Sequence, residues 1–230
     1  MGKRYDALVK DMDLMKLNPL PAAIEVVKKC ANAKFDETVE LHVRLGVDPK
    51  QADQQVRGVV GLPHGLGKSK KIAVVVRGDK QKDAKAAGAD IVGAEDLIEQ
   101  ISKGFTDFDI LVATPDMMKD LSKLGKVLGP KGLMPNPKSG TVTMDIPKTV
   151  KELKAGRVEY KVDDYGIIHV PVGKASFPAP NLVGNAKTVL DAILKAKPSA
   201  SKGIYMISVT VASTMGPGIK VEVSDKAAAA

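Results

Sequence analysis

Lysine, hydroxyl and glycine residues gather in three short segments of the sequence, and each segment offers groups suited to a nucleic-acid backbone. Gly125–Gly140 (GKVLGPKGLMPNPKSG) carries three lysines, Lys126, Lys131 and Lys138, and no acidic residue. Gly173–Phe177 (GKASF) combines a cation, a hydroxyl and a ring, and Thr214–Gly218 (TMGPG) sets a hydroxyl beside glycines. Lysines can meet phosphates, and hydroxyls and bare amides can meet riboses and phosphates. Each segment is equally compatible with an ordinary connector or turn.

Gly61–Ser69 (GLPHGLGKS) contains the residues of a phosphate-binding loop at the wrong spacing. That loop needs four residues between its first glycine and Gly-Lys-Ser/Thr, and a helix must follow. Five residues separate Gly61 from Gly67, and two further lysines and an apolar strand pattern come next. No Gly-x-Gly-x-x-Gly follows the predicted strands of the middle of the chain either. We therefore predict no nucleotide cofactor and interpret the segment as a basic loop between domains.

The sequence offers no catalytic or metal-binding constellation. Its three histidines, His42, His64 and His169, have no second ligand at metal-binding spacing, and no nucleophile, base and acid group together. His42 falls on the polar side of a predicted strand and needs no special role. The single cysteine, Cys30, excludes an intrachain disulfide, and its helical spacing predicts a buried position. We predict that the protein is not an enzyme and holds neither a cofactor nor a metal.

Composition describes a globular protein with an anionic partner. Of 230 residues, 44% are hydrophobic and 27% charged, and the net charge is +8. Aromatic residues make up only 3%, with no Trp, which disfavours a protein that binds single strands mainly by stacking bases on rings. No run of 18 apolar residues and no secretion signal occurs. We expect a soluble, intracellular protein without a membrane partner.

The middle of the chain, residues 67–156, alternates short apolar strands with helices. This order is typical of βαβ units around a parallel sheet, and so of a small three-layer α/β domain. The pattern predicts strands at 72–76, 89–92 and 110–113, and helices at 83–87, 95–101 and 116–124.

The two ends of the chain each carry an incomplete set of α/β elements. Helical spacing predicts helices at 5–16, 23–31 and 182–193, whereas alternation predicts strands at 39–45, 158–162, 168–172, 204–211 and 219–223. We infer one discontinuous domain, residues 1–66 plus 157–230, interrupted by the inserted domain 67–156. Two chain crossings between the domains would allow a hinge.

Five segments together resemble one family. They are Ala33–Thr38 (AKFDET), Gly61–Lys68 (GLPHGLGK), Leu128–Lys138 (LGPKGLMPNPK), Pro171–Phe177 (PVGKASF) and Thr214–Pro217 (TMGP). In this order they resemble the bacterial large-subunit ribosomal protein L-one family, the proteins of the mobile side stalk. The resemblance runs from about residue 3 to residue 223.

The resemblance implies a fold, partners and a location. The discontinuous domain would be a two-layer α/β sandwich with an antiparallel sheet, and the insertion a three-layer Rossmann-like domain. The discontinuous domain would bind a stalk of large-subunit ribosomal RNA, which moves with deacylated transfer RNA leaving the exit site of the ribosome. The protein would also repress translation of its own operon messenger RNA by binding a mimic of the ribosomal site. Its location would be cytoplasmic, on the large ribosomal subunit.

The resemblance also implies which residues contact RNA. The family's first RNA-contacting segment matches Lys34, Phe35 and Thr38; the second matches Ser208, Thr214, Met215 and Gly216; a third includes Lys174 and Ser176, with His169 on the hairpin before it. Folded RNA is recognised by its shape, ribose hydroxyls and phosphates, for which hydroxyls, lysines and bare backbone are better suited than rings.

Two other hypotheses for the function are a nucleotide-dependent enzyme, which the glycine spacing disfavours, and a protein that binds DNA without sequence preference.

Overall fold

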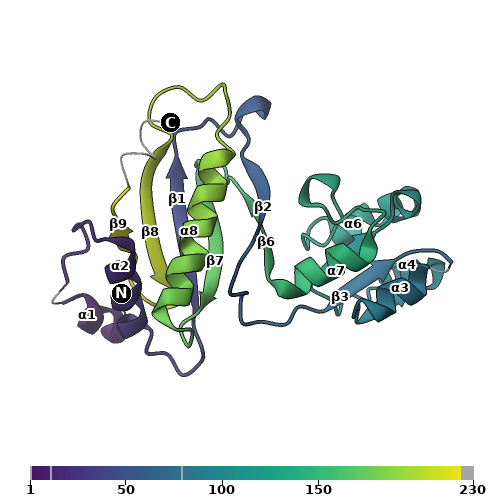
Figure 1. Cartoon of the computed structure of the whole chain (residues 1–230), viewed down its shortest axis with the longest axis horizontal. Coiled ribbons are helices and arrows are strands. Elements are labelled where there is room, and N and C mark those ends of the chain that lie inside the picture. Colours follow the sequence, from purple (N-terminus) through teal and green to yellow (C-terminus); the bar gives the residue numbers. More distant parts are fainter. Residues whose placement is uncertain (1, 11, 79, 224–230) are drawn as a thin grey trace. The chain divides into compact units, whose positions relative to one another are not determined.

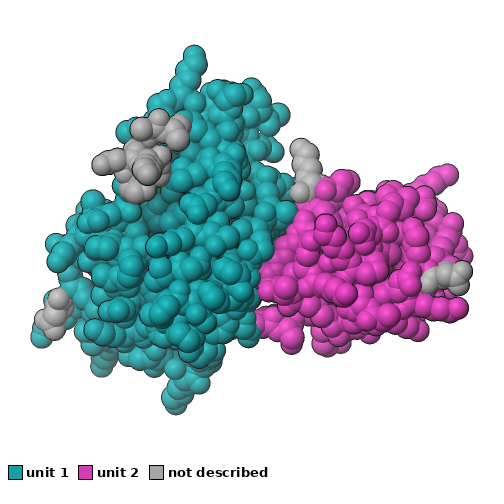
Figure 2. All heavy atoms as spheres, in the orientation of Figure 1, with its two compact units in different colours: residues 1–67, 158–230 teal, residues 68–157 magenta. Residues whose placement is uncertain are grey.

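The computed structural model describes residues 2–10, 12–78 and 80–223, without the side chain of residue 138. The chain is mixed α/β, with one antiparallel and one parallel sheet, which confirms the predicted fold class at that level. It divides into two compact units, Met1–Gly67 with Val158–Ala230 and Lys68–Arg157 (Figure 2). The sequence analysis predicted the domain boundaries at 66/67 and 156/157, and in the structure they lie at 67/68 and 157/158. Each unit is described by itself below.

The first unit is built on a four-stranded antiparallel sheet (Figure 1). Its strands run in the order β7 (Ile167–Lys174), β1 (Thr38–Leu45), β8 (Met206–Ser213) and β9 (Ile219–Val221). Alternate residues of β1 are fully buried, whereas those between them are partly or wholly exposed, so the sheet has one apolar face and one polar face. A separate pair of strands, β2 (Arg57–Gly61) and β6 (Arg157–Lys161), completes the unit.

Two helices, α2 (Leu20–Cys30) and α8 (Ala179–Lys195), cover the apolar face of this sheet. Both begin with proline in the first turn, where its missing N–H costs nothing. Each buries residues three and four apart; in α2 these are Ala23, Ile24, Val27 and Cys30. Cys30 is only 1% exposed, so the prediction that it is a buried apolar residue is confirmed. The opposite, polar face of β1, β7 and β8 is called the open face below.

One predicted helix is shorter than expected. The sequence indicated a helix over 5–16, but α1 covers only Lys3–Val9. Beyond it, the carboxylate of Asp13 accepts a hydrogen bond from the amide of Met15 at 2.9 Å. Such a local bond offers the backbone an alternative to helix. The helix therefore ends although the apolar spacing in the sequence continues.

The second unit is built on a parallel sheet of three strands. β3 (Ile72–Val75) lies between β4 (Ile91–Gly93) and β5 (Ile110–Ala113). One face packs on α3 (Lys80–Ala86) and α7 (Ile146–Ala155), and the other on α4 (Glu95–Ser102) and the turns that follow β5. Because β3 is covered on both sides, all four of its residues are buried, as its continuous apolar run predicted.

The helix predicted over 116–124 is broken into short pieces. A 3₁₀ turn (Pro115–Met117), α5 (Met118–Leu121) and a second 3₁₀ turn (Ser122–Leu124) succeed one another, and α6 (Gly125–Leu128) follows. The hydroxyl of Ser122 donates to the carbonyl of Met118 at 2.6 Å, a local bond that competes with regular helix. Among the described residues, no helix is both long and apolar enough to cross a membrane.

Candidate nucleic-acid interface

Three segments that lie far apart in the sequence meet at one end of the four-stranded sheet. Residues 34–38 lead into β1, residues 174–176 end β7, and residues 214–216 follow β8. Because β1 is antiparallel to both neighbours, its first residue lies beside their last ones: Thr38 pairs with Lys174, and Val39 with Ser213. We call these three segments the sheet-end cluster. The cluster contains eight of the ten residues that the resemblance implied, namely Lys34, Phe35, Thr38, Lys174, Ser176, Thr214, Met215 and Gly216.

Thr214 joins the first and third segments of the sheet-end cluster. Its Oγ1 accepts a hydrogen bond from the amide of Thr38 at 2.9 Å and donates to the carbonyl of Thr38 at 3.3 Å. The amide of Thr214 donates to the same carbonyl at 3.0 Å. The hydroxyl proton is therefore used inside the protein, and the main role of Thr214 in the unbound protein is to hold the two loops together.

Asp36 joins the first and second segments. One of its carboxylate oxygens accepts from the amide of Ser176 at 3.1 Å, and the other from the Ser176 hydroxyl at 2.8 Å. Lys174 Nζ donates to Thr38 Oγ1 at 2.9 Å and to the carbonyl of Asp36 at 3.3 Å. The ammonium of Lys174 and the hydroxyls of Ser176 and Thr38 are thus already positioned by neighbours. Each hydroxyl keeps a lone pair that can accept from a ribose hydroxyl.

Glu37, within the first segment of the cluster, is a buried carboxylate, 1% exposed. Its oxygens accept from the amides of Ala33 at 2.9 Å and Met215 at 3.0 Å. Burial alone would raise the pKa of Glu37, but these two amides, with Ser213 and the charge of Arg4, outweigh it and lower the pKa. Arg4 also donates to the carbonyl of Met215 and, at 2.6 Å, to Oδ1 of Asn32. An ionised Glu37 therefore fixes both loops from below.

Two large apolar side chains project from this hydrogen-bonded base. Phe35 is 54% exposed and Met215 is 51% exposed, and Lys34 beside Phe35 is also exposed. A ring and a polarisable thioether can pack against a sugar or base, and a free ammonium can reach a phosphate. The cluster thus presents apolar contact groups and a cation on a backbone that is already ordered.

Gly216 is required by a contact inside the protein. A Cβ at this position would lie 2.4 Å from Oγ of Ser213 and 3.7 Å from Cβ of Cys30. The resemblance implied that this glycine belongs to an RNA-contacting segment. The structure supplies an internal reason, because a Cβ here would force either the Ser213 hydroxyl or the loop to shift.

The two remaining predicted residues, His169 and Ser208, lie outside the sheet-end cluster. Both lie along the open face: His169 pairs with His42 in the middle of β1, and Ser208 pairs with Arg44 near its end. Ser208 is six residues before Thr214, roughly 20 Å along an extended strand. His42, to which the sequence interpretation gave no role, therefore lies between these positions. The alternation of β1 placed it on the polar face but could not show which residue lies opposite.

Gly61–Lys68 is a packed loop in the structure. Leu62 and Leu66 are buried in the core of the first unit. The side chain of Asn185 in α8 accepts from the amide of His64 at 3.1 Å and donates to the carbonyl of Gly65 at 3.0 Å. Gly67 has a φ of +72°, and a Cβ there would lie 2.8 Å from the ring of Phe177. Packing against α8 and Phe177 thus explains why these residue types occur in a segment whose sequence resembles a phosphate-binding loop.

The lysine-rich segment 125–140 belongs to the second unit. Lys131 donates to Oγ1 of Thr106 at 2.7 Å, also in that unit. The side chain of Lys138 lies outside the described residues. This segment therefore belongs to a different unit from the sheet-end cluster.

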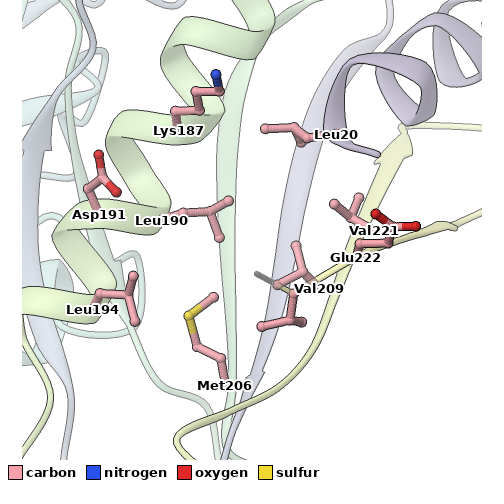
Figure 3. Close-up of a pocket in the computed structure, with 10 residues that line it drawn as sticks. Leu20, Lys187, Leu190, Asp191, Leu194, Met206, Val209, Val221 and Glu222 are labelled. Atoms are coloured by element: carbon pink, nitrogen blue, oxygen red, sulfur yellow. The ribbon is translucent and has the colours of Figure 1, made fainter. Parts of the chain in front are cut away.

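A hollow of about 330 Å³ lies on the helix-covered side of the first unit (Figure 3). Its walls are mostly apolar side chains of α8, β8 and β9, with a charged rim, and include Leu20, Leu190, Leu194, Met206, Val209 and Val221. Of the residues implied to contact RNA, none lines it. In the described ranges, no group of three or more His, Cys, Asp or Glu side chains is placed to hold a metal ion.

The comparison with protein families identifies the chain. The family model described as the Ribosomal protein L1p/L10e family matches residues 27–217. This match covers well over half of the 230 residues and includes the whole sheet-end cluster, His169 and Ser208. Members of this family are structural ribosomal-RNA-binding proteins of the large ribosomal subunit in the cytoplasm, and are not enzymes. The chain belongs to the Ribosomal protein L1p/L10e family.

Proposed function

We propose that the protein binds the side-stalk RNA of the large ribosomal subunit through the sheet-end cluster and the open face. Bound there, it assists the release of deacylated transfer RNA from the exit site. The same surface binds the protein's own operon messenger RNA and represses its translation. The proposal takes RNA binding from family membership. The choice of surface and of these RNAs goes further and rests on the arguments below.

The observation that carries the proposal is the ordered base under Phe35 and Met215. Glu37, Thr214 and Asp36 hold three loops in place through internal hydrogen bonds. A surface ordered before binding loses little conformational entropy when RNA binds, so more of the contact energy becomes affinity. Rigid apolar groups flanked by hydroxyls and lysines suit a partner recognised by its shape and riboses.

Use of one surface for two RNAs gives the repression a simple mechanism. If ribosomal RNA and messenger RNA occupy the same cluster, they must compete for it, and free protein accumulates only when ribosomal sites are filled. The messenger then binds the excess protein. Transfer-RNA release follows in the proposal from the position of the protein on a moving stalk, and no residue of the chain is assigned to it.

Binding of the purified protein to a side-stalk RNA fragment tests the proposal. The titration is run at two salt concentrations, with an unrelated hairpin of equal length as competitor. Preference for the stalk that persists at the higher salt supports a shaped site, because nonspecific binding depends mostly on phosphate charge. Equal binding to both RNAs that is lost at the higher salt would contradict the proposal and favour nonspecific binding. A further titration with a DNA duplex then measures that nonspecific binding.

Matched variants locate the site. Phe35→Ala should weaken binding by about 1–3 kcal/mol, the range for a base stacked on a ring, and Met215→Ala should weaken it as well. Phe105→Ala and Met144→Ala remove the same side chains from exposed positions in the second unit, at 36% and 56% exposure, and should bind as the unchanged protein does. Equal losses in both pairs would remove the sheet-end cluster from the proposal. Competition between the stalk fragment and the messenger leader then tests the repressor role.

A further inference from the structure

Two imidazoles face each other at the centre of the open face. Nδ1 of His42 in β1 lies 2.8 Å from Nδ1 of His169 in β7, and the ring centroids are 5.0 Å apart at 64°. The two residues are directly paired across the strands. At this distance one Nδ1 must carry a proton and donate it while the other accepts.

The neighbours decide which nitrogen carries the proton. Asp163 lies beyond His169, with Oδ2 3.3 Å from Nε2. The other oxygen of Asp163 accepts from the amides of Tyr165 at 2.9 Å and Ile167 at 2.7 Å, which holds the carboxylate in place. Burial would raise the pKa of Asp163, but these amides and His169 lower it, so the group is an anion at neutral pH.

These contacts determine the tautomer of each imidazole in the neutral pair. His169 Nε2–H donates to Asp163, which leaves His169 Nδ1 as an acceptor. His42 must then donate from Nδ1, and its Nε2 is bare. That bare nitrogen lies 3.9 Å from Oε2 of Glu40. One further proton can therefore bind His42 Nε2 beside a carboxylate without breaking the bond between the rings.

Two carboxylates and two cations lie on the open face around the pair. Glu40 and Asp163 are the anions beside it. Arg44 follows two residues after His42 on the same face of β1. Lys220 of β9 is two strands away in the same cross-strand row, with uncharged Thr210 of β8 between. The proton on the imidazole pair therefore changes the charge at the centre of the open face by one unit.

We infer that the His42–His169 pair is a proton-linked phosphate-binding site, which takes up one proton when an RNA phosphate binds at the centre of the open face. This inference rests on the proposed RNA-binding function and adds His42 to its surface. The rings are accessible, since the side chains of His42 and His169 are 27% and 51% exposed. In the free protein, burial and the neighbouring His169 lower the pKa of His42, although Glu40 acts in the opposite direction. A bound phosphate adds a further anion to that of Glu40 and so favours the protonated form of His42 more strongly.

The sign of the pH dependence follows from linkage. A phosphate raises the proton affinity of the pair in the complex above that in the free protein. The added RNA affinity is therefore complete below the pKa of the free pair and is lost as the pH rises through the pKa of the complex. Uptake of one proton limits the change to about tenfold in Kd per pH unit.

The experiment measures Kd for the side-stalk RNA fragment between pH 5.5 and 8.0 at constant ionic strength. We expect the unchanged protein to bind about three- to tenfold more tightly at pH 6 than at pH 7.5, within the limit for one proton. His42→Gln keeps a hydrogen-bonding side chain that does not titrate and should remove this slope. His169→Gln leaves His42 to titrate at a raised pKa and should move the slope to higher pH. His64→Gln changes the third histidine of the chain and should keep it. A flat profile in the unchanged protein, an undiminished slope in His42→Gln, or a slope lost in His64→Gln would each overturn the inference.

A second measurement does not depend on RNA. NMR titration of the imidazole protons in the free protein should show that His169→Gln raises the pKa of His42, because His169 lowers it. The variant His64→Gln should leave the pKa of His42 unchanged. If His42 titrates identically in both variants, the coupled pair does not exist and the inference fails. RNA binding without pH dependence would leave the proposed function standing, whereas no binding at any pH would overturn both.

Discussion

The hydroxyl of Thr214 bonds both backbone groups of Thr38, accepting from its amide at 2.9 Å and donating to its carbonyl at 3.3 Å. The two residues are 176 positions apart in the sequence. Through this one side chain, the loop after β8 fixes the start of β1 and the loop that carries Lys34 and Phe35. In the proposed RNA-binding surface, Thr214 is therefore a positioning residue.

Thr214→Val should weaken binding of the side-stalk RNA by about 1–3 kcal/mol. Valine keeps the shape of the side chain but leaves the amide of Thr38 without its partner, which costs an amount of this order once bound RNA excludes water from it. Filter-binding titration gives the change in Kd, and Thr214→Ser, which retains the hydroxyl, should recover most of it.

Thr188→Val is the matched control for this prediction. Its hydroxyl donates to the carbonyl of Gly184 within α8 at 3.0 Å, away from the sheet-end cluster, so RNA affinity should stay unchanged. Unchanged affinity in Thr214→Val as well would show that the loops keep their positions without this hydroxyl.

Much of the fold could be predicted because the core residues repeat with simple periods. The alternation of Val39, Leu41 and Val43 located β1, and the continuous apolar run of Ile72–Val75 located a strand covered on both faces. Where a local side-chain bond competes with regular structure, periodicity misled: apolar spacing extended α1 past Val9, and the helix expected over 116–124 is broken. Local hydrogen bonds of that kind leave no periodic signal.

The resemblance predicted the residues of the candidate site, whereas nothing in the sequence predicted their contacts. The resemblance pointed to Thr38 and Thr214, and the antiparallel pairing of β1 with β8 brings them together. The partners of these side chains depend on tertiary register, which no spacing in the sequence encodes. The role of Glu37 as a buried anchor and the pairing of His42 with His169 were missed for this reason.

Removing residues 68–156 and joining the ends with a short linker should leave RNA affinity within about threefold of the full chain, less than 1 kcal/mol. The sheet-end cluster, the open face and their core all lie in the other unit. Gly67 must be kept because it packs against Phe177. Circular dichroism first establishes that the shortened chain folds, and a folded chain without RNA affinity would move the site to the removed unit.

Lys34→Ala should lower the dependence of log K on log salt by about 0.7–0.9, the value for one lost phosphate contact. Lys34 is exposed beside Phe35. Lys131→Ala, in the second unit, where the lysine bonds Thr106, removes the same charge and should leave the slope unchanged. Equal slopes for the unchanged protein and Lys34→Ala would mean that this lysine meets no phosphate.

Gly216→Ala should weaken RNA binding because the new Cβ would lie 2.4 Å from Oγ of Ser213 and displace the loop that carries Met215. If the clash is internal, the double variant Ser213→Ala with Gly216→Ala should recover a large part of the affinity, since the next atom in line, Cβ of Ser213, is 3.6 Å away. The double variant thereby separates two reasons for this glycine. Recovery shows that Gly216 serves the packing of the loop, whereas a loss as large as that of Gly216→Ala alone would show that RNA itself needs the space. Titrations of the two single variants and the double variant against the same side-stalk fragment decide between them, and Ser213→Ala alone measures any cost of removing the hydroxyl.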